Sequence, residues 1–385
     1  MPRPPGPAVL GARPPVRPAG ARPPGPRPRR RTGLRLLVAA SAAWGLFTVL
    51  GHLLSGRWWP WLLADLAPPP LFAAVPLLLL ALCLLPLARG ARGRLVPLLV
   101  AVLLAGVPRA GLHWGALVPG GGPGPAPPGA LKVFSWNTLY WDTTDDPGAF
   151  HRFLASRDAD VYLLQEYLAW RDGRPAPVDR LARLRAEFPG YRVVVLGELV
   201  TLSRRPVVAV PPVGSARGLT PRSGWGERFE RGKVLRTDID VDGTVVSFYN
   251  VHVPVQLDVH RSVLSSGFYR VVRDRDAQRR EHYRALLEDA RANRNPVLIS
   301  GDFNTTPAMG DLRGLRSAFQ DALPASSGLL PGTWDAGGPA LWRLDWTFTG
   351  GELAVHRYAF VPPEGLSDHR GQELLVSPAD GAPAG

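Results

Sequence analysis

The stretch that most constrains the fold of this chain is residues 295–307, where a run of apolar residues ends in Gly-Asp-Phe-Asn. An apolar run of this kind predicts a buried strand. Asp302 and Asn304 share strand parity, so we expect both side chains to project into one cleft at the carboxyl end of the strand, the edge where α/β sheets place their chemistry. Taken alone, the stretch also fits a strand that ends in an ordinary Asp/Asn turn.

Other apolar segments in the same part of the chain also end on polar residues. The segment 131–138 exposes Asn137 at its end, the segment 159–166 ends on Glu166, and the segment 245–252 ends on His252. A glutamate at the end of a buried strand is costly unless it is paired or bound to a cation, which favours Glu166 as a ligand. The alternative for each residue taken singly is a side chain that emerges into solvent or a structural histidine.

Three further candidates lie nearer the C-terminus, and the residue types of the whole set suit one kind of chemistry. The polar strand ends and turns are Asn137, Glu166, His252, Asp302, Asn304, Asp345, Asp368 and His369. Asn, Asp and Glu are hard oxygen donors that suit Mg²⁺, and the histidines and remaining carboxylates can orient a water and move protons at a phosphodiester. The chain lacks a Gly-x-Ser-x-Gly elbow and a Gly-rich phosphate loop, which argues against a serine hydrolase and a nucleotidyl kinase.

The net charge of +13 belongs to the N-terminal third of the chain. Residues 1–129 hold 14 arginines against one acidic residue, Asp65, whereas the remainder carries 31 basic and 31 acidic residues. A neutral remainder argues against tight, nonspecific DNA binding, which needs many phosphate contacts. Cys83 is the only cysteine, so no intramolecular disulfide can form.

The same third carries three apolar runs, at 33–54, 66–87 and 95–107. The first two are long enough to cross a hydrocarbon core of about 30 Å as helices, and the third reaches Trp114 only if Arg109 snorkels toward the interface. A cleavable signal peptide is the alternative for the first run, although its apolar part should be about 7 to 15 residues long. The arginine-rich flanks favour a cytoplasmic N-terminus, so three spans place the rest of the chain outside the cytoplasm and two leave it inside.

These features predict five segments. They are a disordered, basic Pro/Arg-rich tail at 1–32, a transmembrane region of about three helices at 33–115, a Pro/Gly linker at 116–129, a catalytic domain at 130–377 and a disordered tail at 378–385. The chain is therefore predicted to be a multi-pass cell-membrane protein that contacts lipid through its helices and holds its catalytic domain outside the cytoplasm. The sequence points to no protein partner.

The polar strand ends, with their neighbours, resemble an ordered set of family motifs. Ser-Trp-Asn at Asn137, Leu-Gln-Glu at Glu166, Asn-Val-His at His252, Gly-Asp-Phe-Asn at Asp302 and Asn304, Leu-Asp-Trp at Asp345 and Ser-Asp-His at His369 are similar to the motifs of the endonuclease/exonuclease/phosphatase superfamily. The resemblance implies an α/β fold, a four-layer α/β/β/α sandwich of two mixed sheets flanked by helices, and hydrolysis of a phosphoester with Mg²⁺ or Mn²⁺. The apolar N-terminal third looks like the membrane-anchored bacterial branch of the superfamily.

The resemblance also implies a role for each motif residue. Asn137 and Glu166 would hold the metal ion, with Asp368 assisting. His369 would be the general base, oriented by Asp345, and Asp302 would position or help to deprotonate the attacking water. In addition, Asn304 would bind the phosphoryl oxygens, and His252 would contact the phosphate or protonate the leaving group.

The expected function is therefore that of a membrane-anchored, divalent-metal-dependent phosphoesterase that hydrolyses a phosphodiester in a nuclease-like way. A phospholipid-headgroup phosphodiesterase or phosphatase of the same superfamily is the alternative, so the substrate is either nucleic acid or phospholipid. A catalytically inactive binding scaffold is the alternative from another class of protein.

Overall fold

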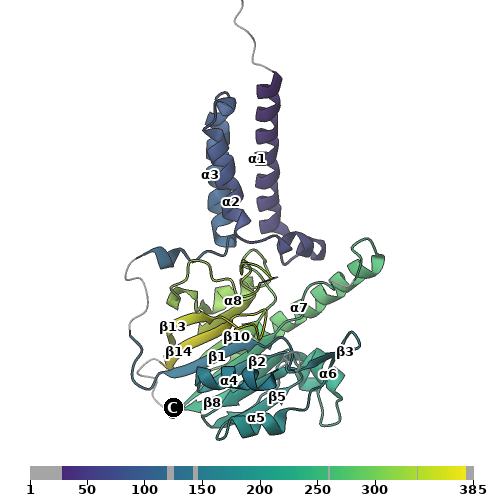
Figure 1. Ribbon diagram of the computed structural model, residues 1–385, viewed down its shortest axis with the longest axis vertical. Coiled ribbons are helices and arrows are strands. Elements are labelled where there is room, and N and C mark those ends of the chain that lie inside the picture. Colours follow the sequence, from purple (N-terminus) through teal and green to yellow (C-terminus); the bar gives the residue numbers. More distant parts are fainter. Residues whose placement is uncertain (1–27, 119–124, 142–145, 259–260, 336, 379–385) are drawn as a thin grey trace, which may run out of the picture.

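The computed structural model describes residues 28–118, 125–141, 146–258, 261–335 and 337–378. It consists of a helical unit, residues 28–118, and a sandwich domain, residues 125–378, which lie one above the other in Figure 1. Most of the predicted tail at 1–32, part of the predicted linker at 116–129 and residues 379–385 of the second tail lie outside the described residues. Helix α1 begins at Pro28, inside the range predicted for the first tail.

The sandwich domain contains two six-stranded mixed sheets, with strand orders β13-β14-β1-β2-β6-β5 and β11-β12-β10-β9-β8-β7. The first sheet is made of β1 Leu131–Asn137, β2 Val161–Gln165, β5 Arg192–Leu196, β6 Leu199–Ser203, β13 Leu353–Val361 and β14 Gly371–Pro378. The second is made of β7 Val207–Ala209, β8 Val234–Val241, β9 Thr244–His252, β10 Val297–Asp302, β11 Gln320–Asp321 and β12 Asp345–Gly350. A separate small hairpin is formed by β3 Ala169–Arg171 and β4 Arg174–Ala176.

The two sheets pack face to face, and helices cover their outer faces. Apolar side chains of both sheets, such as Leu163 and Phe248, form one buried cluster between them. The first sheet is covered by α4 Pro147–Arg157 and α5 Leu181–Glu187, and the second by α7 Ser266–Ala292 and α8 Arg313–Ala318. Shorter helices are η5 Gly214–Gly218, α6 Trp225–Arg231 and η6 Leu323–Ala325. The α/β fold with mixed sheets that the resemblance implies is therefore confirmed, with helix, sheet, sheet and helix layers in that order.

Strand register gathers the polar strand ends at one edge of the sandwich. In the first sheet β1 and β2 run parallel, with Asn137 opposite Gln165. In the second sheet Asp302 stands opposite His252 of β9 and Asp345 of β12. Parallel neighbours end at the same edge, so the apolar strands deliver their polar ends to one place.

Gly301 makes this convergence possible. Its φ is +147°, and a Cβ atom on it would lie 2.0 Å from the carbonyl oxygen of Val251 in the neighbouring strand. Only glycine adopts this backbone conformation and this approach without strain. The glycine of the Gly-Asp-Phe-Asn motif is therefore required by the strand geometry beside Asp302.

The helical unit consists of three helices and short 3₁₀ segments. They are α1 Pro28–Leu54, η1 Trp59–Leu66, α2 Leu71–Cys83, η2 Pro86–Ala88, α3 Arg92–Gly106, η3 Val107–Arg109 and η4 Trp114–Leu117. The three helices lie side by side and rise from one side of the sandwich domain (Figure 1). Leu37, Leu79 and Leu99 belong to one buried cluster that joins them.

The prediction of about three transmembrane helices is not supported. Within the described ranges, Thr32–Leu54 of α1 is the one helix long and apolar enough to cross a membrane, and η1 with α2 would make a second only if this pair, bent by 63°, counts as one broken span. Three prolines at 68–70 interrupt the apolar run 66–87, because proline lacks the backbone N–H that a continuing helix needs. As a result α2 begins only at Leu71 and has 13 residues. The third helix, α3, has 15 residues.

The helical unit is joined to the sandwich domain through a buried polar junction. Ser55 at the end of α1 donates a hydrogen bond of 2.5 Å to Asp65 and accepts one of 2.7 Å from the backbone N–H of Gly310. Asp65 also pairs with Arg109 at 3.4 Å, and both side chains are buried. Each charge in this junction has a partner, which is the arrangement that buried ions require.

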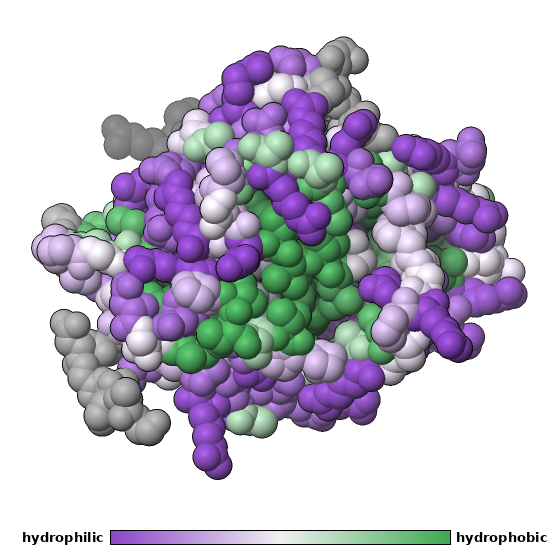
Figure 2. All heavy atoms as spheres, turned by 90° about the horizontal axis from the view of Figure 1, so that it is seen from below, coloured by the Kyte–Doolittle hydropathy of each residue, from purple (hydrophilic) through white to green (hydrophobic). Residues whose placement is uncertain are grey.

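Apolar contacts extend the junction. Ala308, which lies in the loop after β10, shares a buried cluster with Phe72 of α2. Seen from below, the side away from the free ends of the helices, hydrophilic side chains surround a large central hydrophobic area, and smaller hydrophobic areas lie near the edges (Figure 2). Through Ala308, the loop that follows the polar end of β10 packs directly against the helical unit.

Candidate active site

All the predicted site residues meet at the carboxyl edge of the central strands. Asp302 Oδ2 is the point on which they converge: it accepts hydrogen bonds from the side chains of Asn137, at 3.0 Å, and Asn304, at 3.2 Å. The same oxygen lies 3.7 Å from Nε2 of His252 and 3.7 Å from Nε2 of His369. Burial raises the pKa of the Asp302 carboxyl, because its charged form has lost water.

Glu166 lies on the side of the site formed by β1 and β2. Its Oε1 accepts a hydrogen bond of 3.1 Å from the Asn137 side chain and lies 3.9 Å from His252 Nε2. The backbone of Glu166 has a φ of +61°, a conformation that costs free energy for a residue other than glycine and is often found at functional sites. Burial raises the pKa of this carboxyl as well.

His369 and Asp345 form a hydrogen-bonded pair. Nδ1 of His369 lies 2.8 Å from Oδ2 of Asp345, which leaves Nε2 directed toward Asp302 and 4.0 Å from Asp368 Oδ1. Burial alone would lower the pKa of His369, but the carboxylates of Asp345 and Asp302 outweigh it and raise the pKa to about 10. The carboxylate fixes the orientation of the imidazole, as in hydrolases that use a histidine to move a proton.

His252 has a buried partner that the sequence does not predict. Its Nδ1 lies 3.2 Å from Oε2 of Glu198, and the other oxygen of that carboxylate, Oε1, accepts a hydrogen bond from the buried ammonium group of Lys233. Burial alone would lower the pKa of His252, but the charge of Glu198 outweighs it and, with the neighbouring carboxylates, raises the pKa to about 9. Conversely, burial would raise the pKa of Glu198, but His252 and Lys233 lower it to about 2.

Strand direction explains why a search for polar residues at the ends of apolar strands does not identify Glu198 and Lys233. β6 runs antiparallel to β2, and β8 runs antiparallel to β9, so the residues just before β6 and β8 arrive at the edge where β2 and β9 end. In the sequence, Glu198 follows Gly197 between two apolar runs and looks like part of a solvated hairpin turn. A lone acidic residue in a tight turn between apolar strands is the signal that could have identified it.

Asn304 is held by its own loop. Its φ is +46°, its backbone N–H donates to Asp302 Oδ1 at 2.7 Å, and its side-chain amide donates to the carbonyl of Val253 at 3.0 Å. Its carbonyl oxygen accepts hydrogen bonds from Arg279 of α7, at 3.2 Å, and from Gln256. These contacts keep Asn304 beside Asp302 although it lies beyond the end of β10.

Asp368 is oriented by a tryptophan that the sequence does not predict either. The Trp334 indole N–H donates to Asp368 Oδ2 at 2.8 Å, and its ring packs edge-on against Trp342 with the centroids 5.6 Å apart. The Trp342 indole in turn donates to the carbonyl of Leu66 in η1 at 3.3 Å. The two tryptophans therefore connect the site to the helical unit.

The donor set fits a hard divalent cation. Glu166 Oε2, Asp345 Oδ1 and Asp368 Oδ1 are buried and have no hydrogen-bond partner among the described residues. Buried carboxylate oxygens are costly in this state unless a cation or proton satisfies them, and oxygen donors suit Mg²⁺ and Mn²⁺. Rotation of the Asn137 amide would direct its oxygen toward Glu166 and Asp302, to which its nitrogen now donates.

A second grouping of ligand-type atoms overlaps the first. Ligand atoms of Asp302, Asp345 and His369 all lie within 4.8 Å of one another. Because the 2.8 Å hydrogen bond between Asp345 and His369 already occupies one ligand atom of each, this group is better suited to proton transfer than to binding a metal ion. Contacts of 4.0 Å or less thus join the predicted residues into one site. Carboxylate and amide groups suited to a metal ion lie at one part of it, and the histidines suited to proton transfer lie at the other.

The sequence profile of the Endonuclease/Exonuclease/phosphatase family matches residues 134–369, which include all these side chains. The chain belongs to this family. Among curated proteins no match to the chain was found. The family membership confirms that the chain is of the phosphoester hydrolase class in general.

Several solved structures are similar to this family member. A family protein from Leptotrichia buccalis C-1013-b is 18% identical, with 64% of this chain and 100% of that chain covered and a TM-score of 0.44. The mannosyl-6-phosphatase Bt3783 of Bacteroides thetaiotaomicron VPI-5482 is 15% identical, with 64% and 100% covered and a TM-score of 0.44. A 3′ phosphatase from Neisseria bound to a product DNA hairpin is 16% identical, with 64% and 100% covered and a TM-score of 0.47. The family assignment rests on the profile match and not on these likenesses.

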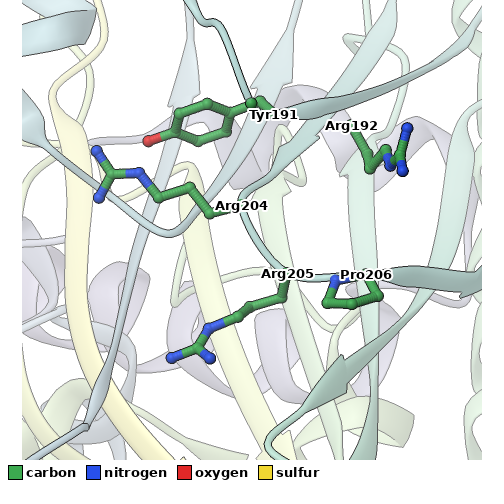
Figure 3. Close-up of a pocket in the computed structure, with 6 residues that line it drawn as sticks. Tyr191, Arg192, Arg204, Arg205 and Pro206 are labelled. Atoms are coloured by element: carbon green, nitrogen blue, oxygen red, sulfur yellow. The ribbon is translucent and has the colours of Figure 1, made fainter.

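A separate surface hollow lies at the opposite edge of the first sheet. It is lined by Gly190, Tyr191, Arg192, Arg204, Arg205 and Pro206. Arg204 and Arg205 follow the end of β6, whose last residue pairs with the first residue of β2, far from the carboxyl edge of that strand. Figure 3 shows Arg204 beside the Tyr191 ring, and both Arg204 and Arg205 are paired with aspartates. The hollow is therefore not part of the candidate active site.

Proposed function

We propose that this protein is a membrane-anchored phosphoesterase that requires Mg²⁺ or Mn²⁺ and hydrolyses a phosphodiester. The observation that carries the proposal is the convergence of acidic, amide and imidazole side chains on Asp302 Oδ2, beside buried carboxylate oxygens that lack partners within the described part of the chain. An inactive binding scaffold has no need to keep such costly groups together.

In this proposal Asn137, Glu166 and Asp368 hold the metal ion. The ion would supply charge that stabilises the phosphate in the transition state and lowers the pKa of a bound water. Asp302 contacts Asn137 of this group and lies 3.7 Å from Nε2 of each histidine, so it is placed to orient the attacking water. Asn304, whose amide lies beside Asp302, is placed to contact the phosphoryl oxygens.

The two histidines would divide the movement of protons. His369, oriented by Asp345, accepts the proton of the water, and His252, held in its charged form by Glu198, donates to the leaving oxygen or contacts the phosphate. The raised pKa of His252, about 9, supports its role as the donor at neutral pH. His369 must lose its proton before it acts as the base, because the carboxylates of Asp345 and Asp302 raise its pKa to about 10.

The membrane anchor in this proposal is α1. Of its apolar stretch, 22% is buried inside the protein, which suits side chains that face lipid. Figure 1 places the N-terminal end of α1 and the arginine-bearing turn between α2 and α3 at the same end of the helical unit, away from the sandwich domain. By the positive-inside rule that end is cytoplasmic, which would put the sandwich domain on the other side.

The proposal is tested by assaying the full-length protein in detergent with Mg²⁺, Mn²⁺ or EDTA. Bis-p-nitrophenyl phosphate, plasmid DNA and phospholipid serve as substrates, so that nuclease and phospholipid-headgroup activities are compared directly. We expect turnover that EDTA abolishes and His369→Ala removes. His356→Ala, which alters a half-buried histidine of β13 that is bonded to Ser377 of β14, should leave turnover intact. Full metal-dependent turnover in His369→Ala would refute the assigned role, and no turnover of any substrate would favour the scaffold.

A further inference from the structure

Exposed apolar side chains gather beside the lower end of α1. The turn before α7 carries Val263 and Leu264, of which Leu264 is 93% exposed, and Tyr269 of α7 and Trp58 before η1 are also exposed. Figure 1 shows the N-terminal end of α7 extending away from the sandwich toward the level at which α1 ends. We call Trp58, Val263, Leu264 and Tyr269 the interfacial surface.

Packing fixes the position of this surface relative to α1. Leu62 of η1 shares a buried cluster with Phe268 and Val272 of α7, and Trp59 packs against the same cluster. Since η1 follows α1 after only a few residues, the cluster holds the start of α7 at the height where the apolar stretch of α1 ends. The exposed side chains therefore continue the contact that joins α7 to the helical unit.

We propose that the interfacial surface lies in the headgroup region of the bilayer that α1 crosses. Trp and Tyr side chains prefer that depth, and an almost fully exposed leucine beside other exposed apolar side chains marks a contact surface. Arg57 and Arg270 are exposed nearby and suit anionic headgroups. The inference rests on the membrane anchorage of the proposed function and adds a second, loop-borne contact with lipid.

This contact would hold the candidate site close to the membrane surface. The segment after His252 leads toward the interfacial surface, and its Gln256 side chain is bonded to the carbonyl of Asn304. Arg275 of α7 donates to the carbonyl of Leu257 in the same segment at 2.5 Å. Leu257 also packs against the cluster that holds the interfacial surface, so one segment links that surface to the site. A phosphoester carried by a lipid of the same bilayer is the substrate that this arrangement favours.

The test uses single cysteines labelled with the fluorophore NBD in full-length protein reconstituted into vesicles of phosphatidylethanolamine and phosphatidylglycerol. The only native cysteine, Cys83, is buried and is replaced by Cys83→Ala. Leu264→Cys reports on the interfacial surface, and Val49→Cys reports on α1. Val208→Cys, as exposed as Val49 at 54%, lies on edge strand β7 and serves as the control in water.

Nitroxide-labelled lipids should quench the label at positions 264 and 49 but not at 208. Quenching at 49 without quenching at 264 would overturn the inference and leave the anchorage intact, whereas no quenching at 49 would overturn the anchorage itself. Blue-shifted emission at 264 without quenching would mean that a second copy or another protein covers the surface, which also overturns the inference.

A second readout uses Leu264→Asp with the native cysteine in place. We expect several-fold slower hydrolysis of vesicle phospholipid and unchanged turnover of soluble bis-p-nitrophenyl phosphate, with Val208→Asp as the matched control. Equal phospholipid turnover in the two variants would contradict the inference. Because quenching is independent of catalysis, a protein that hydrolyses neither substrate would refute the proposed function while the quenching result still decides the inference.

Discussion

The junction with the helical unit and the candidate active site both bury charged side chains, but they satisfy them differently. In the junction Asp65 has both Ser55 and Arg109 as partners. In the site, Glu166 and Asp368 each leave one buried oxygen without a partner among the described residues. Paired charges hold two parts of the molecule together, whereas unpaired ones are retained for a ligand.

The largest expected effect is on catalysis and comes from Asp302→Asn. The substitution keeps the shape of the side chain but removes the charge on which the site converges, so kcat should fall by about 10³-fold, or about 4 kcal/mol in the barrier. The free energy of unfolding should stay the same or rise, because burial disfavours this carboxylate. Turnover of bis-p-nitrophenyl phosphate and thermal unfolding measure the two effects, with Asp242→Asn on the surface as control.

The next effect is on stability and comes from Asp65→Ala in the junction. Removing one member of a buried pair leaves Arg109 uncompensated, which should cost about 3 kcal/mol of unfolding free energy. Chemical denaturation of the full-length protein in detergent measures it. Glu288→Ala, which breaks the exposed pair with Arg284 on α7, should cost less than about 1 kcal/mol. Equal stability losses in the two variants would remove the distinction between buried and exposed pairs.

A smaller, pH-dependent effect is expected for Glu198→Gln. The pKa of Glu198 is lowered from 4.5 to about 2, so its contribution to stability is present above pH 4.5 and lost as the pH falls toward 2. The pKa of His252 is raised from 6.5 to about 9, so its contribution is present below pH 6.5 and lost as the pH rises through 9.

The stability deficit of Glu198→Gln relative to the native protein should therefore be largest between about pH 4.5 and 6.5 and shrink on both sides of that window. Denaturation at a series of pH values measures it. Glu227→Gln, which alters an exposed pair with Arg231, is the matched control. A deficit that does not vary with pH would contradict the coupling of Glu198 to His252.

The smallest effect is expected for Trp334→Phe. The substitution removes the hydrogen bond to Asp368 but keeps an aromatic ring, and loss of such a supporting contact should weaken metal affinity by about tenfold. Trp342→Phe removes only the hydrogen bond to Leu66 and should change affinity less. Titration of Mn²⁺ against each variant compares them, and a larger loss in Trp342→Phe would indicate that the helical unit controls Asp368.

The sequence predicts the site better than it predicts its surroundings. Three site residues end apolar strands: Asn137, His252 and Asp302. Parallel pairing in each sheet brings such strand ends to one edge, so the strand pattern alone identifies these residues as site candidates. Glu198 reaches the same edge from the start of an antiparallel strand, which requires knowledge of the sheet order. The family resemblance supplies the layers of the sandwich, which the strand pattern alone does not define.

The helical unit shows a second limit of sequence reasoning. Hydropathy predicts a 22-residue apolar run at 66–87, but helix formation there is limited by Pro68, Pro69 and Pro70 at one end and Pro86 near the other. The packing of Ala308 against Phe72, and the hydrogen bond between Ser55 and Gly310, join residues far apart in the chain and leave no local pattern.

Mn²⁺ binding to the full-length protein, followed by electron paramagnetic resonance, tests the central claim most directly. We predict that the native protein binds Mn²⁺ and that Glu166→Gln, which keeps the size of the side chain, loses this binding while remaining folded. Native protein that binds no Mn²⁺, or Glu166→Gln that binds it as tightly as the native protein does, would contradict a metal site at the convergence of these strands.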